Sequence, residues 1–136
     1  MSETAFFIRR QAAKITPLVL EKLLPKLPML KMEFTQIKSP EFPHLFEQLE
    51  FLADVVEDFA EGADKEIPYT TVAEAAFAIL FVHRHLDILP DDGDGHGQAH
   101  ATDSSVVRNV IQHHQAVLSA YAARHQMAWN GAITKP

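Results

Sequence analysis

The feature that most constrains the fold is an apolar segment from Val72 to Leu86, in which a helix would be polar on almost no side. Residues 71–74 match a capping box, which predicts that this helix begins at Thr71, and Pro90 is predicted to end it. Its longest apolar run is too short to span a bilayer. We therefore expect this helix at the centre of a bundle, covered by the rest of the chain.

Two further segments predict long amphipathic helices. Residues 39–41 (Ser-Pro-Glu) are typical of a helix start, with a capping hydroxyl, a proline in the first turn and an acid near the positive end. Gly62 is expected to end this helix, because glycine readily adopts positive φ. Its apolar residues recur at three- and four-residue steps: Leu45, Phe46, Leu49, Leu52, Val55, Val56 and Phe59. The last long helix is expected to be capped by Thr102 or Asp103. Its stripe is Val106, Val107, Val110, Ile111, Val117, Leu118 and Tyr121.

The N-terminal third predicts shorter helices. One fits residues 4–15 and another fits residues 18–24, between prolines that prevent a single undisturbed helix. Residues 29–39 show no clear period and are expected to connect to the main body. No segment has the strict alternation of a strand, and the sequence contains no internal repeat.

The fold class is therefore predicted to be all-α. With 136 residues, 47% of them hydrophobic, the chain can bury a single core. We expect a single-domain helical bundle of about three long helices plus short N-terminal helices. Residues 1–38 would be a basic amphipathic segment packing on the body, residues 39–130 the helical domain, and residues 131–136 a loose tail. Trp129 is expected to pin this tail. Phe51 falls off its stripe, so we expect the N-terminal segment or a second subunit to cover it.

Composition excludes several classes of protein. The net charge of -6 argues against nucleic acid as a partner, because phosphate binding requires a basic face. The absence of cysteine excludes disulfides, thiolate metal sites and cysteine nucleophiles. The first residues lack the basic start and long apolar run of a signal peptide. A cytoplasmic protein is expected.

The charge is distributed unevenly along the chain. Residues 1–38 hold seven Lys/Arg and three Asp/Glu, a net of +4, and the remaining residues have a net of -10. The basic, apolar residues 5–32 therefore have two interpretations. They could pack on the acidic body, or they could dock on a protein partner or an anionic membrane surface, which would make the protein peripherally membrane-associated.

An acidic stretch follows the central helix. Residues 87–91 read Asp-Ile-Leu-Pro-Asp, and residues 91–102 form an expected loop that contains three of the five glycines. Upstream, residues 56–59 read Val-Glu-Asp-Phe, and residues 66–68 read Glu-Ile-Pro. Over about residues 50–120 the chain resembles the YkvA-like family, small helical domains of unknown function. The resemblance implies an all-helical fold and no particular activity. It also implies an acidic corner at Asp87, Pro90, Asp91 and Asp103.

The chain departs from that family pattern at three places. His85 stands where the family usually has proline, and Ser104 replaces the second residue of an aspartate pair. The loop is also longer, and residues 92–97 (Asp-Gly-Asp-Gly-His-Gly) replace apolar residues.

The acidic corner has a structural and a metal-binding interpretation. Asp87 lies in the last helical turn, where the helix dipole disfavours negative charge, so it requires a compensating donor, arginine or cation. In the structural interpretation Asp91 forms a turn and Asp103 caps the next helix. In the metal-binding interpretation, the loop binds calcium. Its residues take five places of the twelve-residue calcium-loop template: Asp92, Asp94, His96, Gly97 and Asp103.

Histidine adds a transition-metal alternative. His96 and His100 are four residues apart with Asp92 and Asp94 nearby, and imidazole plus carboxylate suits zinc, nickel or iron. Three helix histidines could approach the loop: His83, His114 and His125. No cofactor is predicted outright, and a divalent cation is the alternative.

The sequence assigns no catalytic residues, and the only candidates for acid–base catalysis are the same aspartates and histidines. It contains no nucleophile motif, no phosphate-cradling glycine loop and no cofactor fingerprint. We therefore expect a non-catalytic interaction or accessory module, open to a protein partner or self-association. The alternative functions are a metal-binding regulatory domain that uses the 87–103 loop and a peripheral membrane module that uses residues 5–32.

Overall fold

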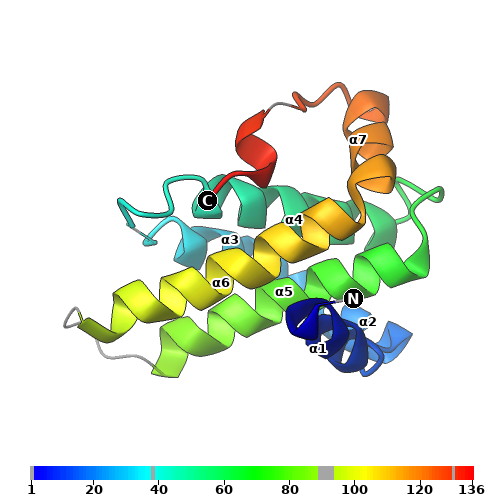
Figure 1. The fold of residues 1–136 in the computed structure, drawn as a ribbon. Coiled ribbons are helices and arrows are strands. Elements are labelled where there is room, and N and C mark those ends of the chain that lie inside the picture. Colours follow the sequence, from blue (N-terminus) through cyan, green and yellow to red (C-terminus); the bar gives the residue numbers. More distant parts are fainter. Residues whose placement is uncertain (1, 38, 89–93, 130) are drawn as a thin grey trace.

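The computed structural model describes all of residues 1–136 except 1, 38, 89–93 and 130, and gives only the backbone for 85–88, 94–100 and 131–132. The described residues are helical or irregular and include no strand, which confirms the all-α prediction (Figure 1). The elements in chain order are α1 (Glu3–Ala12), α2 (Pro17–Leu23), η1 (Leu24–Lys26), α3 (Leu27–Phe34), α4 (Leu45–Ala60), α5 (Tyr69–Ile88), α6 (Asp94–His113), α7 (Gln115–Arg124) and η2 (Gly131–Thr134).

Helical turns follow one another through the prolines of the N-terminal segment. Thr16 caps α2, and its hydroxyl accepts a hydrogen bond from the amide of Val19 at 3.3 Å. Pro25 and Pro28 are the second residues of η1 and α3, within the first turn of each. Proline is tolerated there because those amides have no intrahelical partner. The prediction of an irregular connection from residue 29 is therefore wrong up to Phe34.

The helix α4 begins at Leu45, five residues later than the predicted start after Ser39. Residues 39–44 form turns, in which the amide of Phe42 donates to the carbonyl of Ser39. Pro43 explains the delay, because a residue before proline avoids the helical conformation and Phe42 is therefore held outside the helix. At the other end the prediction is confirmed: α4 ends at Ala60, and Gly62 has a φ of 79°.

The boundaries of the last two long helices also differ from the predicted ones. The helix α5 starts at Tyr69, so Thr71 lies inside it rather than at its cap. The helix α6 starts at Asp94 and includes most of the predicted loop, so Asp103 lies in its interior. Residues 98–101 are mostly favourable helix formers, and each glycine costs a helix only about 1 kcal/mol.

The central position of α5 is confirmed. It contacts α1, α3, α4 and α6, and Figure 1 shows α5 and α6 side by side with α1 crossing them. Phe7 of α1 meets Phe77 and Phe81 of α5 edge-on, with ring centroids 5.7 and 6.2 Å apart. A single cluster of buried side chains draws on every helix from α1 to α7.

The C-terminal residues are held against the bundle. Part of the segment that was expected to be a loose tail forms η2. The side-chain amide Nε2 of Gln48 donates to the backbone carbonyls of Ile133 and Lys135 at 3.3 and 2.6 Å. Phe51 is buried by Tyr121 and Trp129, with ring centroids at 5.7 and 5.9 Å. The expectation that the N-terminal segment or a second subunit covers Phe51 is therefore wrong.

In the part of the chain that the structure describes, no helix combines the length and apolar character needed to cross a bilayer.

Candidate functional site

The predicted acidic corner falls mainly outside the described residues. Asp87 is in the last turn of α5 with its side chain undescribed, and Pro90 and Asp91 are not described at all. Asp103 is described: it lies on α6 with its side chain fully buried. The convergence of the three carboxylates stays a prediction, whereas the role of Asp103 as a helix cap is wrong.

Most of the predicted metal-binding residues also lack described side chains. Asp92 is outside the described residues, and Asp94, His96 and His100 lie on α6 with undescribed side chains. Helical backbone from Asp94 onward is incompatible with the looped conformation that the calcium template requires. That loop geometry is therefore wrong.

The three histidines that were expected near the loop contact carboxylates elsewhere in the fold. Nδ1 of His83 lies 2.9 Å from Glu33 on α3. Nε2 of His125 lies 2.7 Å from Asp64. His114 faces Glu74 on α5.

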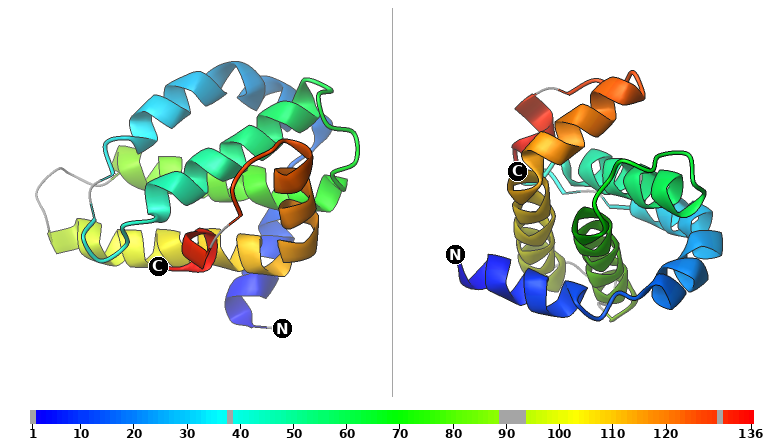
Figure 2. Two further views of the ribbon diagram at one scale, coloured as in Figure 1. Left: turned by 90° about the horizontal axis from the view of Figure 1, so that it is seen from above. Right: turned by 90° about the vertical axis from the view of Figure 1, so that its right-hand side faces the viewer.

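An exposed apolar stripe follows the outer side of α2, η1 and α3. Leu18, Met29 and Met32 are 57%, 56% and 73% exposed, the highest values among the large hydrophobic residues of the described chain. The opposite side is buried at the steps of a helix: Leu20, Leu23, Leu27, Leu30 and Phe34. The right-hand view of Figure 2 shows α2 and α3 at the periphery of the molecule. One side of this segment is therefore buried in the core, and the other side is exposed to solvent.

The lysines near this stripe lie on two sides of the segment, one facing α4 and the other facing solvent. On the inner side Lys31 pairs with Asp54 at 2.7 Å and Glu57 at 3.5 Å of α4. Burial lowers the pKa of Lys31, but the two carboxylates outweigh burial and raise it. On the outer side Lys22 and Lys26 are exposed beside the stripe. Glu21 of α2 is exposed as well, so the outer surface of α2 and η1 is apolar with a small net positive charge.

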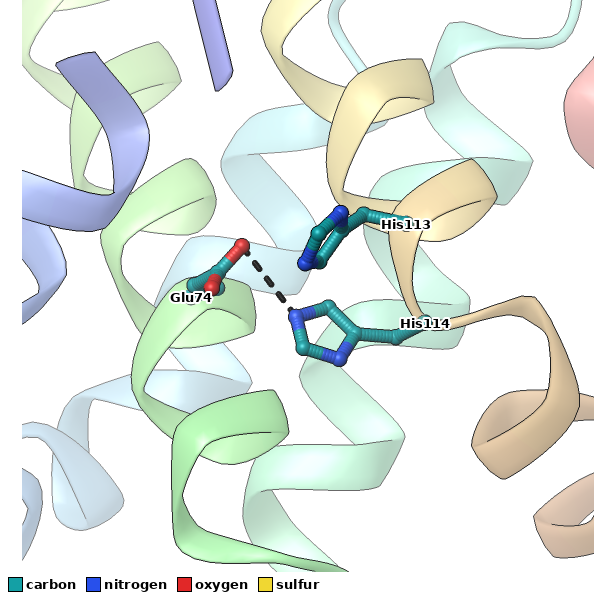
Figure 3. A group of neighbouring side chains, drawn as sticks. All are labelled: Glu74, His113 and His114. Atoms are coloured by element: carbon teal, nitrogen blue, oxygen red, sulfur yellow. Dashed lines mark ion pairs between the residues drawn. The ribbon is translucent and has the colours of Figure 1, made fainter. Parts of the chain in front are cut away.

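A cluster of metal-ligating side chains lies between α5 and the end of α6. Figure 3 shows Glu74, His113 and His114 turned toward one another. One ligand atom from each lies within 4.8 Å of the other two, and Nε2 of His114 is 3.1 Å from Oε1 of Glu74. On the other side of its ring, Nδ1 of His114 is 3.0 Å from the hydroxyl of Thr71.

The break between α6 and α7 makes this cluster possible. Adjacent residues of an uninterrupted helix project about 100° apart and do not face the same point. His114 has φ of -108° and ψ of 27°, outside the helical region, so both imidazoles can face Glu74. The sequence predicts one continuous helix through this point, which is wrong.

A second polar cluster ties the loop after α4 to the end of α7. Oδ1 of Asp64 accepts from the amide of Glu66, and Oδ2 accepts from Arg124 and faces Nε2 of His125. Burial raises the pKa of Asp64, but the contacts with His125, the Glu66 amide and Arg124 outweigh burial and lower it. Both oxygens of Asp64 bind structural partners, so this cluster stabilises the fold.

Tyr121 extends this cluster into the core. Its hydroxyl donates to the carboxylate of Asp58 on α4, and its ring lies beside that of His125 with centroids 4.5 Å apart. Burial, then the Asp58 carboxylate, raises the pKa of Tyr121.

Sequence reasoning missed the grouping of Glu74 with His113 and His114. Glu74 and the two histidines are almost forty positions apart, and the sequence around Glu74 indicates a helix cap. The available signal was the paired histidine at residues 113–114, together with Glu74 as the one carboxylate of the apolar segment from Val72 to Leu86.

No family model, curated protein or solved structure matches this chain. The resemblance to the YkvA-like family accordingly stays a prediction, and function has to be argued from the geometry.

Proposed function

We propose that the protein is a single-domain, non-catalytic helical accessory module that binds reversibly to anionic membrane surfaces through the outer side of α2, η1 and α3. The observation that carries the proposal is the stripe of Leu18, Met29 and Met32, exposed on a segment whose other side is buried in the core. A membrane would bury this stripe without any change in the fold.

The expected affinity follows from the size of the stripe. Burying three half-exposed apolar side chains contributes about 1 kcal/mol each or slightly more. Lys22 and Lys26 add about 1 kcal/mol each near an anionic leaflet. The sum of about 5–6 kcal/mol is comparable with a single myristoyl chain, which gives marginal, reversible binding. Such a module would respond to small changes in lipid charge.

Charge favours an anionic surface as the occupant. Residues 1–38 have a net charge of +4, whereas the rest of the chain has a net of -10. Attraction to anionic lipid would bring the N-terminal helices to the membrane and turn the acidic body toward water. The methionines add side chains that adapt to an irregular, fluid surface.

Replacement of Leu18, Met29 and Met32 together by serine should weaken binding to phosphatidylserine-containing vesicles about a hundredfold, because roughly 3 kcal/mol of apolar burial is lost. Vesicle co-sedimentation measures this change. The matched control places three serines at Ala116, Ala120 and Ala123, which are exposed on α7. The control should bind as the unaltered protein does, and binding should fall as salt rises.

Two outcomes would contradict this function. One is equal binding of the altered and control proteins to anionic vesicles. The other is concentration-dependent dimerisation without vesicles, measured by sedimentation, that the three stripe substitutions abolish; it would assign the stripe to a second copy of the chain.

A further inference from the structure

We propose that Glu74, His113 and His114 form a binding site for a transition-metal ion of the zinc class, independent of the membrane-binding surface. The three side chains come from α5 and from the junction of α6 with α7, and they turn toward a common point (Figure 3). One carboxylate and two imidazoles form a donor set found in three-ligand zinc sites, where water takes the fourth position.

The distances are close to those of a metal site. Zinc bonds to nitrogen and oxygen are about 2.0–2.1 Å long, so two ligand atoms of a tetrahedral site lie roughly 3.3 Å apart. Nε2 of His114 and Oε1 of Glu74 are already 3.1 Å apart. His113 is exposed and can close the remaining distance by a small side-chain rotation, since all three ligand atoms lie within 4.8 Å.

The buried imidazole provides a second, independent observation. The side chain of His114 is 10% exposed, and its buried Nε2 lies 3.1 Å from Oε1 of Glu74 but makes no hydrogen bond of acceptable geometry. In the tautomer in which Nδ1–H donates to the hydroxyl of Thr71, the lone pair of Nε2 is free for a metal. A metal ion would give this buried nitrogen the partner that it lacks beside Glu74.

The surroundings select the class of ion. Arg9 of α1 lines the same narrow cleft as Glu74, together with Asn109 and His113. A site with one carboxylate and a nearby guanidinium is unfavourable for calcium or magnesium, which require several oxygen ligands. Imidazole nitrogen instead favours zinc or nickel. The same arginine is expected to limit the affinity by charge repulsion.

Calorimetric titration of tag-free protein with zinc ion alone tests this site. We expect one ion per chain, bound more than tenfold more weakly by His113→Ala and by Glu74→Gln, because loss of a ligand costs at least about as much as loss of a supporting contact. His113 is exposed, so its replacement leaves the core intact. His44→Ala, outside the cluster at the start of α4, is the matched control and should bind normally.

A second measurement identifies the ligands directly. Addition of zinc should shift the imidazole nitrogen resonances of His113 and His114 in the NMR spectrum, but not that of His44. The proposal is overturned if no ion binds, or if His113→Ala and Glu74→Gln bind as tightly as the unaltered protein. It is also overturned if only the paired change His96→Ala and His100→Ala abolishes binding, since the ion would then belong to the 87–103 segment.

Discussion

Replacement of Ile79 by alanine should lower the free energy of unfolding by about 3–4 kcal/mol, the range typical of large-to-small changes in a core that cannot collapse. Ile79 is fully buried on α5, and that helix contacts α1, α3, α4 and α6. Neighbours on all sides hold the cavity open. Urea denaturation followed by circular dichroism measures the loss, which should also lower Tm by roughly 10 °C.

Leu18 provides the control for this substitution. Its side chain is of similar size but is 57% exposed on the outer side of α2. Leu18→Ala should change the free energy of unfolding by less than about 0.5 kcal/mol. Equal losses for Leu18→Ala and Ile79→Ala would contradict the division of this fold into a core centred on α5 and an outer side that folding does not use.

Replacement of Asp64 by alanine should cost about 3 kcal/mol, because it removes a buried carboxylate and leaves its donors without their acceptor. The losses include the contacts with the Glu66 amide, Arg124 and His125, which join the loop after α4 to α7. Arg124 is partly exposed and regains water, so the cost is near the lower end for a buried pair. Thermal unfolding of Glu66→Ala, whose side chain is 72% exposed, is the control and should change little. An Asp64→Ala protein as stable as this control would contradict the structural role of the cluster.

The same carboxylate predicts how stability depends on pH. The pKa of Asp64 is lower in the folded state than in the unfolded chain. Its contribution is therefore fully present above the unfolded value of about 3.9 and is lost as the pH falls through the folded value. Denaturation curves should show the unaltered protein losing stability in that acidic range. Asp64→Ala should lose less there.

The helical class and the central helix follow from local sequence. The apolar segment from Val72 to Leu86 would be polar on almost no side of a helix, and Gly62 ends the preceding helix with the positive φ that glycine permits. These signals depend on residues close together in the chain. They give the right result because local preference and burial agree.

The errors arise where one local signal competes with another. Ser39 and Pro40 resemble a helix start, but Pro43 holds Phe42 outside the helix. The glycines after residue 92 suggest a loop, yet α6 begins at Asp94 because its other residues favour helix. Each outcome depends on small differences in free energy that a pattern of residue types does not resolve.

The candidate sites depend on contacts between distant residues. Nothing near Glu74 in the sequence indicates that His114 lies 3.1 Å away, because that contact requires the break between α6 and α7. The outer stripe is visible only once the opposite side of α2 and α3 is known to be buried. Amphipathic spacing alone permits either the core or a partner to cover such residues.

The most direct test of membrane docking uses the absence of cysteine from the chain. A single cysteine at Met29, labelled with an environment-sensitive fluorophore, should shift its emission to the blue when anionic vesicles are added. The same label at Ala120, exposed on α7, should not respond. No shift at position 29, or an equal shift at both positions, would contradict binding through α2 and α3.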